Sequence, residues 1–368
     1  MKPSWIHLAR GRYVRQARVG LGELREELFG RQGFAGPTAT LYHSRPPGDV
    51  LRIVGKLKPR MFSTRKLMAG EGNDGRGLPL PFLTNSDVTL SVSNRRSAMP
   101  YAYRDADGDL LYFIHEGTGV MATEYGPIPY EPGDYIYLPR GTTFRQMPND
   151  GLTYAFVIES VQPIDFAAHP QQGRHFPFDP QLITVPSAEE YAWPEQDEWE
   201  LCIRSQGELT SVFFEKSPFD VVGWKGDLFP FKINMRDIHT LSSERIHIAP
   251  TSWATFQAPG FVVVTFLPRP SVNDLDAEEL PSSHRNIDCD EAIFVHSDTG
   301  REGASFIFSP QGIHHGPPDA FRREFNRKRV KGMQTMLTGV SVDTFKPLNP
   351  TPAMLAVADG ETTEINCR

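Results

Sequence analysis

Short apolar runs alternate with turn residues along most of the chain. Over residues 110–160 these runs recur about every ten residues and are mostly separated by Gly or Pro, which is typical of strands in a β-sandwich or barrel. They are Leu110–His115, Gly119–Thr123, Asp134–Leu138 and Tyr154–Glu159. A second β-rich region is expected from Glu208 to about Asp343, and it contains the continuous apolar run Phe261–Leu267.

Helical spacing is found near the N-terminus. Leu21, Leu24 and Leu28 recur at i, i+3 and i+7, which predicts a short helix over about 21–30. Residues 163–200 are rich in Pro, Asp and Glu and predict a connection between the two β-rich regions. We therefore expect an N-terminal β domain over 1–225, which includes this connection, and a C-terminal β domain over 226–368.

The composition supports a turn-rich fold. The 32 Pro and 31 Gly residues are spread along the chain, and together they exceed the average share of about 12%. Such a density of helix breakers excludes a helical bundle and a coiled coil. Apolar residues (39%) and aromatic residues (11%) are sufficient for a packed core, which excludes a disordered chain. An all-β fold with few short helices remains.

Charge and cysteine content narrow the class of protein. The formal net charge of −7 gives no reason to expect a nucleic-acid partner. The cysteines Cys202, Cys289 and Cys367 form no CxxC pair, which argues against a disulfide scaffold and structural zinc. The first residues contain no apolar signal region, and the longest apolar run is too short to span a bilayer. A soluble, cytoplasmic protein with no membrane partner is expected.

One local run of basic residues departs from the acidic balance. We expect it to form a solvated loop or helix face, and the alternative is a site that attracts an anionic small molecule such as a carboxylate-bearing substrate. The run comprises Arg322, Arg323, Arg327, Lys328, Arg329 and Lys331.

Two segments share a turn signature built from Pro and Gly. Residues 132–144 fit the pattern G-x5-P-x-G-x2-(H), with Phe144 where a His would stand. Residues 310–315 fit P-x-G-x2-H, with His315 in place. Both segments resemble the second motif of the cupin barrel, in which an early residue of the following strand points into the barrel. A His at that point can bind a metal ion, whereas a Phe cannot.

The segments upstream of the two signatures differ in the same way. His284-Arg285-Asn286 and Glu291 form H-x-N-x4-E, which resembles the first cupin motif with Asn286 in place of its second His. The segment that begins at His115 lacks the paired His. The first barrel is therefore expected to be metal-free, and the second is expected to hold a metal ion.

The retained residues have a definite chemistry. Two imidazoles and one carboxylate form the facial triad of non-heme Fe(II) oxygenases, which leaves coordination positions open for substrate and O2. His284, Glu291 and His315 are therefore candidate metal ligands. The alternative is that both His residues are ordinary hydrogen-bonded barrel residues and that Glu291 lies on a solvated edge.

Several segments together resemble the homogentisate 1,2-dioxygenase family, in that family's order and over most of the chain from about Leu41. They are Leu41-Tyr42-His43, residues 108–119, 139–143 and 219–224, His284-Arg285-Asn286, His315-Gly316-Pro317 and residues 342–348. The resemblance implies a bicupin and an Fe(II)-dependent dioxygenase that cleaves the ring of homogentisate with O2 to give maleylacetoacetate in tyrosine and phenylalanine breakdown. It also implies a small aromatic substrate and a homo-oligomer, a trimer or hexamer.

The resemblance also implies roles for individual residues. His284, Glu291 and His315 fall on the iron-ligand positions. His247 falls in the segment that carries the family's active-site His, which orients or deprotonates the ring hydroxyl; otherwise it is an ordinary strand residue. His314 either supports the ligands without binding the metal ion or binds the metal ion in place of His315.

The chain departs from the family in the expected wall of the substrate pocket. Ser282-Ser283 replace an aromatic pair before the first ligand, and the tyrosines that usually follow the ligand Glu are absent. A dioxygenase for another phenol, such as gentisate, hydroquinone or a secondary metabolite, is therefore the first alternative. A non-catalytic metal-binding bicupin and a zinc or manganese isomerase or hydrolase are the others.

Overall fold

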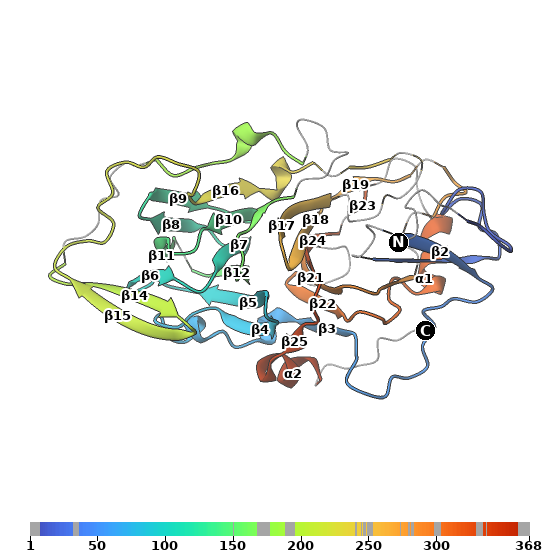
Figure 1. The fold of residues 1–368 in the computed structure, drawn as a ribbon, viewed down its shortest axis with the longest axis horizontal. Helices are drawn as coiled ribbons and strands as arrows, with labels where there is room; N and C mark the ends of the chain where they lie inside the picture. Colours follow the sequence, from blue (N-terminus) through green and yellow to red (C-terminus); the bar gives the residue numbers. More distant parts are fainter. Residues whose placement is uncertain are drawn as a thin grey trace.

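The computed structural model shows the expected mostly β fold (Figure 1). The two α-helices of the described part are short: α1 (Asp319–Lys328) and α2 (Pro352–Ala358). Within the described residues, no helix is long and apolar enough to cross a membrane. The structure describes residues 8–31, 37–149, 151–167, 177–187, 196–239, 241–243, 245, 248, 253–272, 274–278, 280, 283–297, 303–328, 334–335 and 337–359.

Two sheets form the first half of the molecule, on the left of Figure 1. The central sheet runs in the order β16 (Phe231–Asn234), β10 (Asp134–Leu138), β7 (Asp109–Glu116), β12 (Thr153–Ser160), β5 (Val88–Arg95), β4 (Leu80–Thr84) and β25 (Asn349–Pro350). The outer sheet runs in the order β15 (Glu208–Phe214), β14 (Trp199–Ser205), β6 (Ala102–Asp105), β11 (Thr143–Pro148), β8 (Gly119–Thr123) and β9 (Gly126–Tyr130). The four strands predicted over residues 110–160 are confirmed as β7, β8, β10 and β12.

Three further sheets form the second half. The site sheet runs in the order β13 (Asp165–Phe166), β17 (Ala254–Ala258), β18 (Phe261–Phe266), β24 (Thr338–Thr344), β21 (Asp290–Ser297), β22 (Ser305–Ser309) and β3 (Arg60–Ser63). The hairpin sheet runs in the order β2 (Thr38–His43), β1 (Arg25–Gly30) and β20 (Ser283–Asn286). Strands β19 (Arg269–Pro270) and β23 (Gln334–Thr335) form a small two-stranded sheet.

The central sheet is buried on both faces. Along β7, Tyr112 packs in the core shared with the outer sheet, whereas its neighbour Phe113 packs in the core shared with the site sheet. In that second core, the rings of Phe156 and Phe294 stack with centroids 5.2 Å apart and an interplanar angle of 4°. Because side chains alternate along a strand, Phe294 on β21 faces the central sheet and Glu291 faces the interior of the second half.

Strands from both sides of residue 225 share sheets. Strand β1 pairs with β20, β3 pairs with β22, β16 pairs with β10, and β25 pairs with β4. The division into 1–225 and 226–368 stays a prediction, but each half of the molecule includes strands from the other side of that boundary. The N-terminal hairpin β1–β2 is thereby part of the framework around β20.

The helix predicted over 21–30 is wrong, because Arg25–Gly30 forms strand β1. Strand β1 pairs in antiparallel register with β2 and in parallel register with β20. Its side chains Glu26 and Glu27 are buried. Strand pairing on both edges supplies hydrogen bonds to partners that are distant in the sequence, and it outweighs the weak local preference of three leucines.

Candidate metal centre

Two turns bring the candidate ligands together. His284 lies on β20, and a short turn leads from it to Glu291 at the start of β21. Strand β22 ends in the turn that precedes His315, in which Gly312 adopts φ +83° and donates a hydrogen bond to the carbonyl of Asn286. Only glycine adopts such a conformation at little cost, which explains the Gly of the sequence signature.

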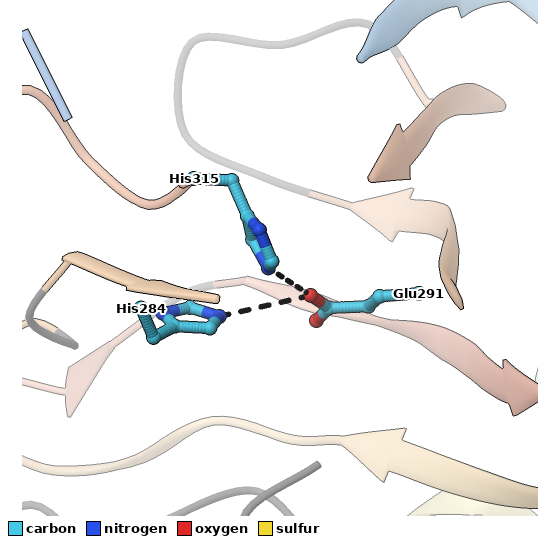
Figure 2. Close-up of side chains that lie close together, drawn as sticks. All are labelled: His284, Glu291 and His315. Carbon is cyan, nitrogen blue, oxygen red and sulfur yellow. Dashed lines mark hydrogen bonds and ion pairs between the residues drawn. The ribbon is translucent and has the colours of Figure 1, made fainter. Parts of the chain in front are cut away.

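The backbone fixes the two imidazoles side by side. His284 and His315 form an isolated antiparallel bridge, with N–H to carbonyl distances of 3.0 and 2.9 Å. Their ring centroids lie 4.1 Å apart, and both rings point toward the carboxylate of Glu291 (Figure 2). Oε2 of Glu291 lies 2.8 Å from Nε2 of His315 and 3.7 Å from Nε2 of His284. The three side chains offer ligand atoms that all lie within 4.8 Å of one another.

The protonation of the site suits a cation. Nδ1 of His315 lies 3.0 Å from the carbonyl oxygen of Ile313. Donation by this Nδ1–H leaves Nε2 as the ligand atom. Without a cation, Nε2 carries the proton that it donates to Glu291; burial opposes this charge, but the contact with Glu291 outweighs burial and raises the pKa of His315. A bound cation would take the place of that proton. Burial alone would raise the pKa of Glu291, but hydrogen bonds and charge from the two imidazoles hold its pKa well below the usual range. Glu291 is therefore an ionised carboxylate beside two nitrogen donors.

Further polar groups lie beside the three ligands. Asp343 on β24 stands directly opposite Glu291 in the sheet, and burial together with the negative charge of Glu291 raises the pKa of Asp343 to about 7. Oδ1 of Asn286 is buried without a hydrogen-bond partner among the described residues. Asn286 is two residues from His284 on β20, so both side chains face the same side of the strand. Two imidazoles, an ionised carboxylate and a buried acceptor oxygen fit a divalent metal ion that carries further ligands.

The corresponding place in the first half is filled by aromatic side chains. Phe144 on β11 is buried, and its ring packs edge-on against Tyr103 at 5.5 Å and Tyr112 at 6.3 Å between centroids. A ring packed in this way has no donor atom for a metal ion. The contrast between Phe144 and His315 seen in the sequence is therefore also a contrast in packing.

Three further histidines, among them the predicted His314 and His247, lie apart from the ligand atoms or outside the described residues. His314 points away from Glu291, because its Nε2 lies 2.9 Å from Oε1 of Glu27. His296, at the far end of β21, lies with its Nδ1 2.9 Å from Nδ1 of His115 on the central sheet. His247 lies outside the described residues, and its predicted catalytic role stays a prediction.

Most of the basic run forms part of helix α1, and its described members are ion-paired. Arg322 is buried and pairs with Asp319 at 2.8 Å and with Glu278 at 3.6 Å. Arg327 and Lys328 are exposed and both pair with Glu324. The expected solvated helix face therefore describes Arg323, Arg327 and Lys328, whereas Arg322 is a buried structural residue. Arg329 and Lys331 lie outside the described residues.

Sequence reasoning missed Glu27 and Asp343 as neighbours of the site. Asp343 lies within the segment 342–348 that resembles the dioxygenase family, so a signal for it was present. Glu27 was missed because a helix over 21–30 gave no reason to expect its carboxylate to be buried near the site. Its position depends on strand pairing with β20, which is more than 250 residues away in the sequence.

Comparison with known proteins agrees with the sequence resemblance. Residues 85–235 match the family model described as homogentisate 1,2-dioxygenase N-terminal. A protein of Saccharolobus solfataricus named "Putative dioxygenase" is 31% identical over 329 residues, covering 83% of this chain and 84% of that protein.

Solved structures that match this chain include a cupin 2 conserved barrel domain protein from Leptotrichia buccalis, at 10% identity and a TM-score of 0.38 over 80% of this chain and 98% of that one. Protein Ylba from E. coli has 8% identity and a TM-score of 0.32 over 81% of this chain and 91% of that one. From the matches in sequence, which extend over most of its length, the chain belongs to the homogentisate 1,2-dioxygenase family of cupin-type dioxygenases.

Proposed function

We propose that this protein is a non-heme Fe(II) dioxygenase that cleaves the aromatic ring of homogentisate with O2 and gives maleylacetoacetate. The observation that carries the proposal is the convergence of His284, Glu291 and His315 in a chain of this family. The proposal places the protein in the cytoplasmic breakdown of tyrosine and phenylalanine. A trimeric or hexameric assembly is part of the same proposal.

The three residues would hold the metal ion through two neutral imidazoles and one carboxylate. When bound, Fe(II) would supply adjacent open positions for an aromatic hydroxyl and O2, together with the redox chemistry that O2 requires. A single carboxylate ligand leaves the centre with a charge near +1, so a substrate that binds as a monoanion makes it roughly neutral. Burial of the ligands limits the access of water, which strengthens these electrostatic interactions.

Residues of the chain have separate tasks in this proposal. The carbonyl of Ile313 holds His315 in the tautomer that presents Nε2. The backbone bridge between His284 and His315 fixes the separation of the two rings. His247 is proposed to accept the proton of the substrate hydroxyl, which converts the phenol into the better-binding phenolate.

The second candidate is a dioxygenase of the same fold for another hydroquinone or phenol. The observation in its favour is the Ser282-Ser283 pair in place of aromatic residues. Ser283 stands opposite Glu27 in the parallel pairing of β20 with β1, so it faces away from the side of His284. Ser282 lies outside the described residues.

The test is O2 consumption by the Fe(II)-loaded protein with homogentisate, gentisate and hydroquinone in parallel. The proposal predicts uptake of O2 with homogentisate and formation of maleylacetoacetate. Uptake only with gentisate or hydroquinone would favour the second candidate, and bound metal without uptake would indicate a non-catalytic bicupin. Metal analysis in the same samples would reveal zinc or manganese in place of iron.

A variant at His247 tests the proposed proton acceptor. His247→Ala should retain iron and lower turnover by about 10²- to 10⁴-fold, which is the range for loss of a general base. His239→Ala, a change at an exposed His, serves as the control and should retain turnover. Loss of iron from His247→Ala would instead identify His247 as a ligand.

A further inference from the structure

A second charged cluster lies close to the candidate ligands and is centred on Glu27. Its side chain is about 1% exposed. Oε1 lies 2.9 Å from Nε2 of His314 and 3.0 Å from Nε of Arg285, and Oε2 lies 2.7 Å from Nε2 of His43. The two imidazoles lie within hydrogen-bond distance of the carboxylate, and Arg285 forms an ion pair with it. One buried carboxylate therefore joins three segments of the chain.

The cluster lies behind the two candidate His ligands. Arg285 follows His284 on β20, and His314 precedes His315, so each partner of Glu27 is the immediate neighbour of a ligand. Adjacent residues in extended backbone point to opposite sides. The two ligand rings therefore face Glu291, whereas Arg285 and His314 face Glu27 on the other side of the same backbone bridge.

We propose that Glu27 is a positioning residue that sets the separation of His284 and His315 by holding Arg285 and His314 from behind. The inference rests on the proposed function, because it assumes that the two His residues bind a metal ion. It assigns a role in the metal centre to the N-terminal hairpin, which lies more than 250 residues before the ligands. His43 on β2 secures the other strand of that hairpin to the same carboxylate.

The burial and charge of Glu27 favour this role over an incidental ion pair. A buried carboxylate costs free energy unless it is paired and hydrogen-bonded. Its three partners are each between about a quarter and about a third exposed, so the carboxylate is the buried centre of the cluster. Movement of either ligand-bearing segment would break at least one of its contacts, and the carboxylate therefore restricts both.

The test compares Glu27→Gln with Glu26→Gln in the metal-free full-length protein. Glu26 is a matched control, because it is a neighbouring carboxylate of β1, is 3% exposed and accepts a hydrogen bond from the backbone N–H of Arg18 at 2.8 Å. Titration with Co(II), followed by visible absorption, gives both the dissociation constant and a spectrum that reports the coordination geometry. Thermal unfolding of the metal-free proteins measures any loss of stability separately.

The inference predicts that Glu27→Gln weakens Co(II) binding by about tenfold, near the lower end of the range for residues that orient metal ligands, and changes the spectrum at saturation. Glu26→Gln should retain the dissociation constant and the spectrum of the unmodified protein. Equal dissociation constants and spectra for the two folded variants would overturn the inference, since both would then act on stability alone.

A second variant keeps the test decisive if Glu27→Gln does not fold. His314→Ala removes one partly exposed partner and should weaken Co(II) binding in the same direction. If both single variants fold, the affinity of the double variant for Co(II) should equal that of the single variant that binds Co(II) less tightly. The two substitutions remove the same contact, so their effects should not add. Full additivity of the two effects would contradict the inference. If the unmodified protein binds no Co(II), the proposed metal centre itself fails.

Discussion

The contact between His115 and His296 joins the two halves of the molecule and makes stability depend on pH. Nη2 of Arg65 lies 3.4 Å from Nε2 of His115 and donates to it, which places the ring proton of His115 on Nδ1. This Nδ1–H donates to Nδ1 of His296 at 2.9 Å. The rings of Tyr154 and Phe294 cover His115 at 6.0 and 5.3 Å. A proton added to Nδ1 of His296 would replace their hydrogen bond by two facing N–H groups, and a proton added to Nε2 of His115 would face the guanidinium of Arg65.

The direction of the pH effect follows from the pKa values. Burial, the neighbouring His296 and the charge of Arg65 lower the pKa of His115 from 6.5 to about 3, and burial also lowers the pKa of His296. Glu116, the other charged group beside the pair, is ion-paired with Arg65 at 2.6 Å. The unfolded chain therefore binds a proton at pH 5 that the folded chain excludes. Stability is fully present above pH 6.5 and falls as the pH drops toward 3.

The loss of stability between pH 7 and pH 5 can be calculated from these pKa values. One pKa unit corresponds to about 1.4 kcal/mol, so lowering the pH from 7 to 5 should cost about 2 kcal/mol through His115 alone. His115→Gln removes the titrating group and should lose about 2 kcal/mol less than the unmodified protein over this interval. The free energy of unfolding from urea titrations at pH 7 and pH 5 measures this difference.

A histidine away from this contact serves as the control. His239 is exposed, and His239→Gln should reproduce the pH dependence of the unmodified protein within about 0.5 kcal/mol. Titrating groups that contact neither substituted residue are common to all three proteins and cancel in the comparison. If His115→Gln lost as much stability between pH 7 and pH 5 as the unmodified protein, the neutral His–His contact would be wrong.

Two further predictions concern stability, and urea titration at pH 7 measures both. Phe294→Ala should lower the free energy of unfolding by about 3–5 kcal/mol, because Phe294 is fully buried between the halves. Phe213→Ala, at an exposed strand residue, should change it by less than about 0.5 kcal/mol. Similar effects of the two substitutions would contradict the described core. Arg322→Ala should cost about 1–3 kcal/mol, because it removes the buried charged partner of Asp319 at 2.8 Å, while Arg25 and Arg323 still pair with that carboxylate. Arg327→Ala removes an exposed ion pair and should change stability by less than about 1 kcal/mol, and equal losses would refute the distinction.

The sequence predicted the elements that depend on local patterns. The strands of the central sheet have dense apolar runs bounded by Gly or Pro, and β8 and β10 begin and end at the predicted residues. The candidate ligands were predicted because the turn before His315 needs a Gly of positive φ, which leaves a recognisable pattern. The convergence of His284, Glu291 and His315 then followed from the order of the motifs.

The remaining features depend on pairing between distant segments. Strand β1 has no alternating apolar pattern, because Glu26 and Glu27 are buried through polar contacts on opposite faces. Strand β3 has only four residues and finds its partner β22 more than 240 residues later. Local propensity carries no information on such pairing, since register and partner are set by tertiary contacts. The role of Glu27 could therefore be recognised only in the folded chain.

The metal content of the purified protein tests the central claim most directly. Fe(II) is added anaerobically to the metal-free protein and to His315→Ala, excess iron is removed, and the bound iron per chain is measured. We expect one iron per chain in the unmodified protein and almost none in His315→Ala, with unchanged circular dichroism. Retention of one iron per chain by His315→Ala, or no bound iron in the unmodified protein, would contradict the assignment of His284, Glu291 and His315 as the metal centre.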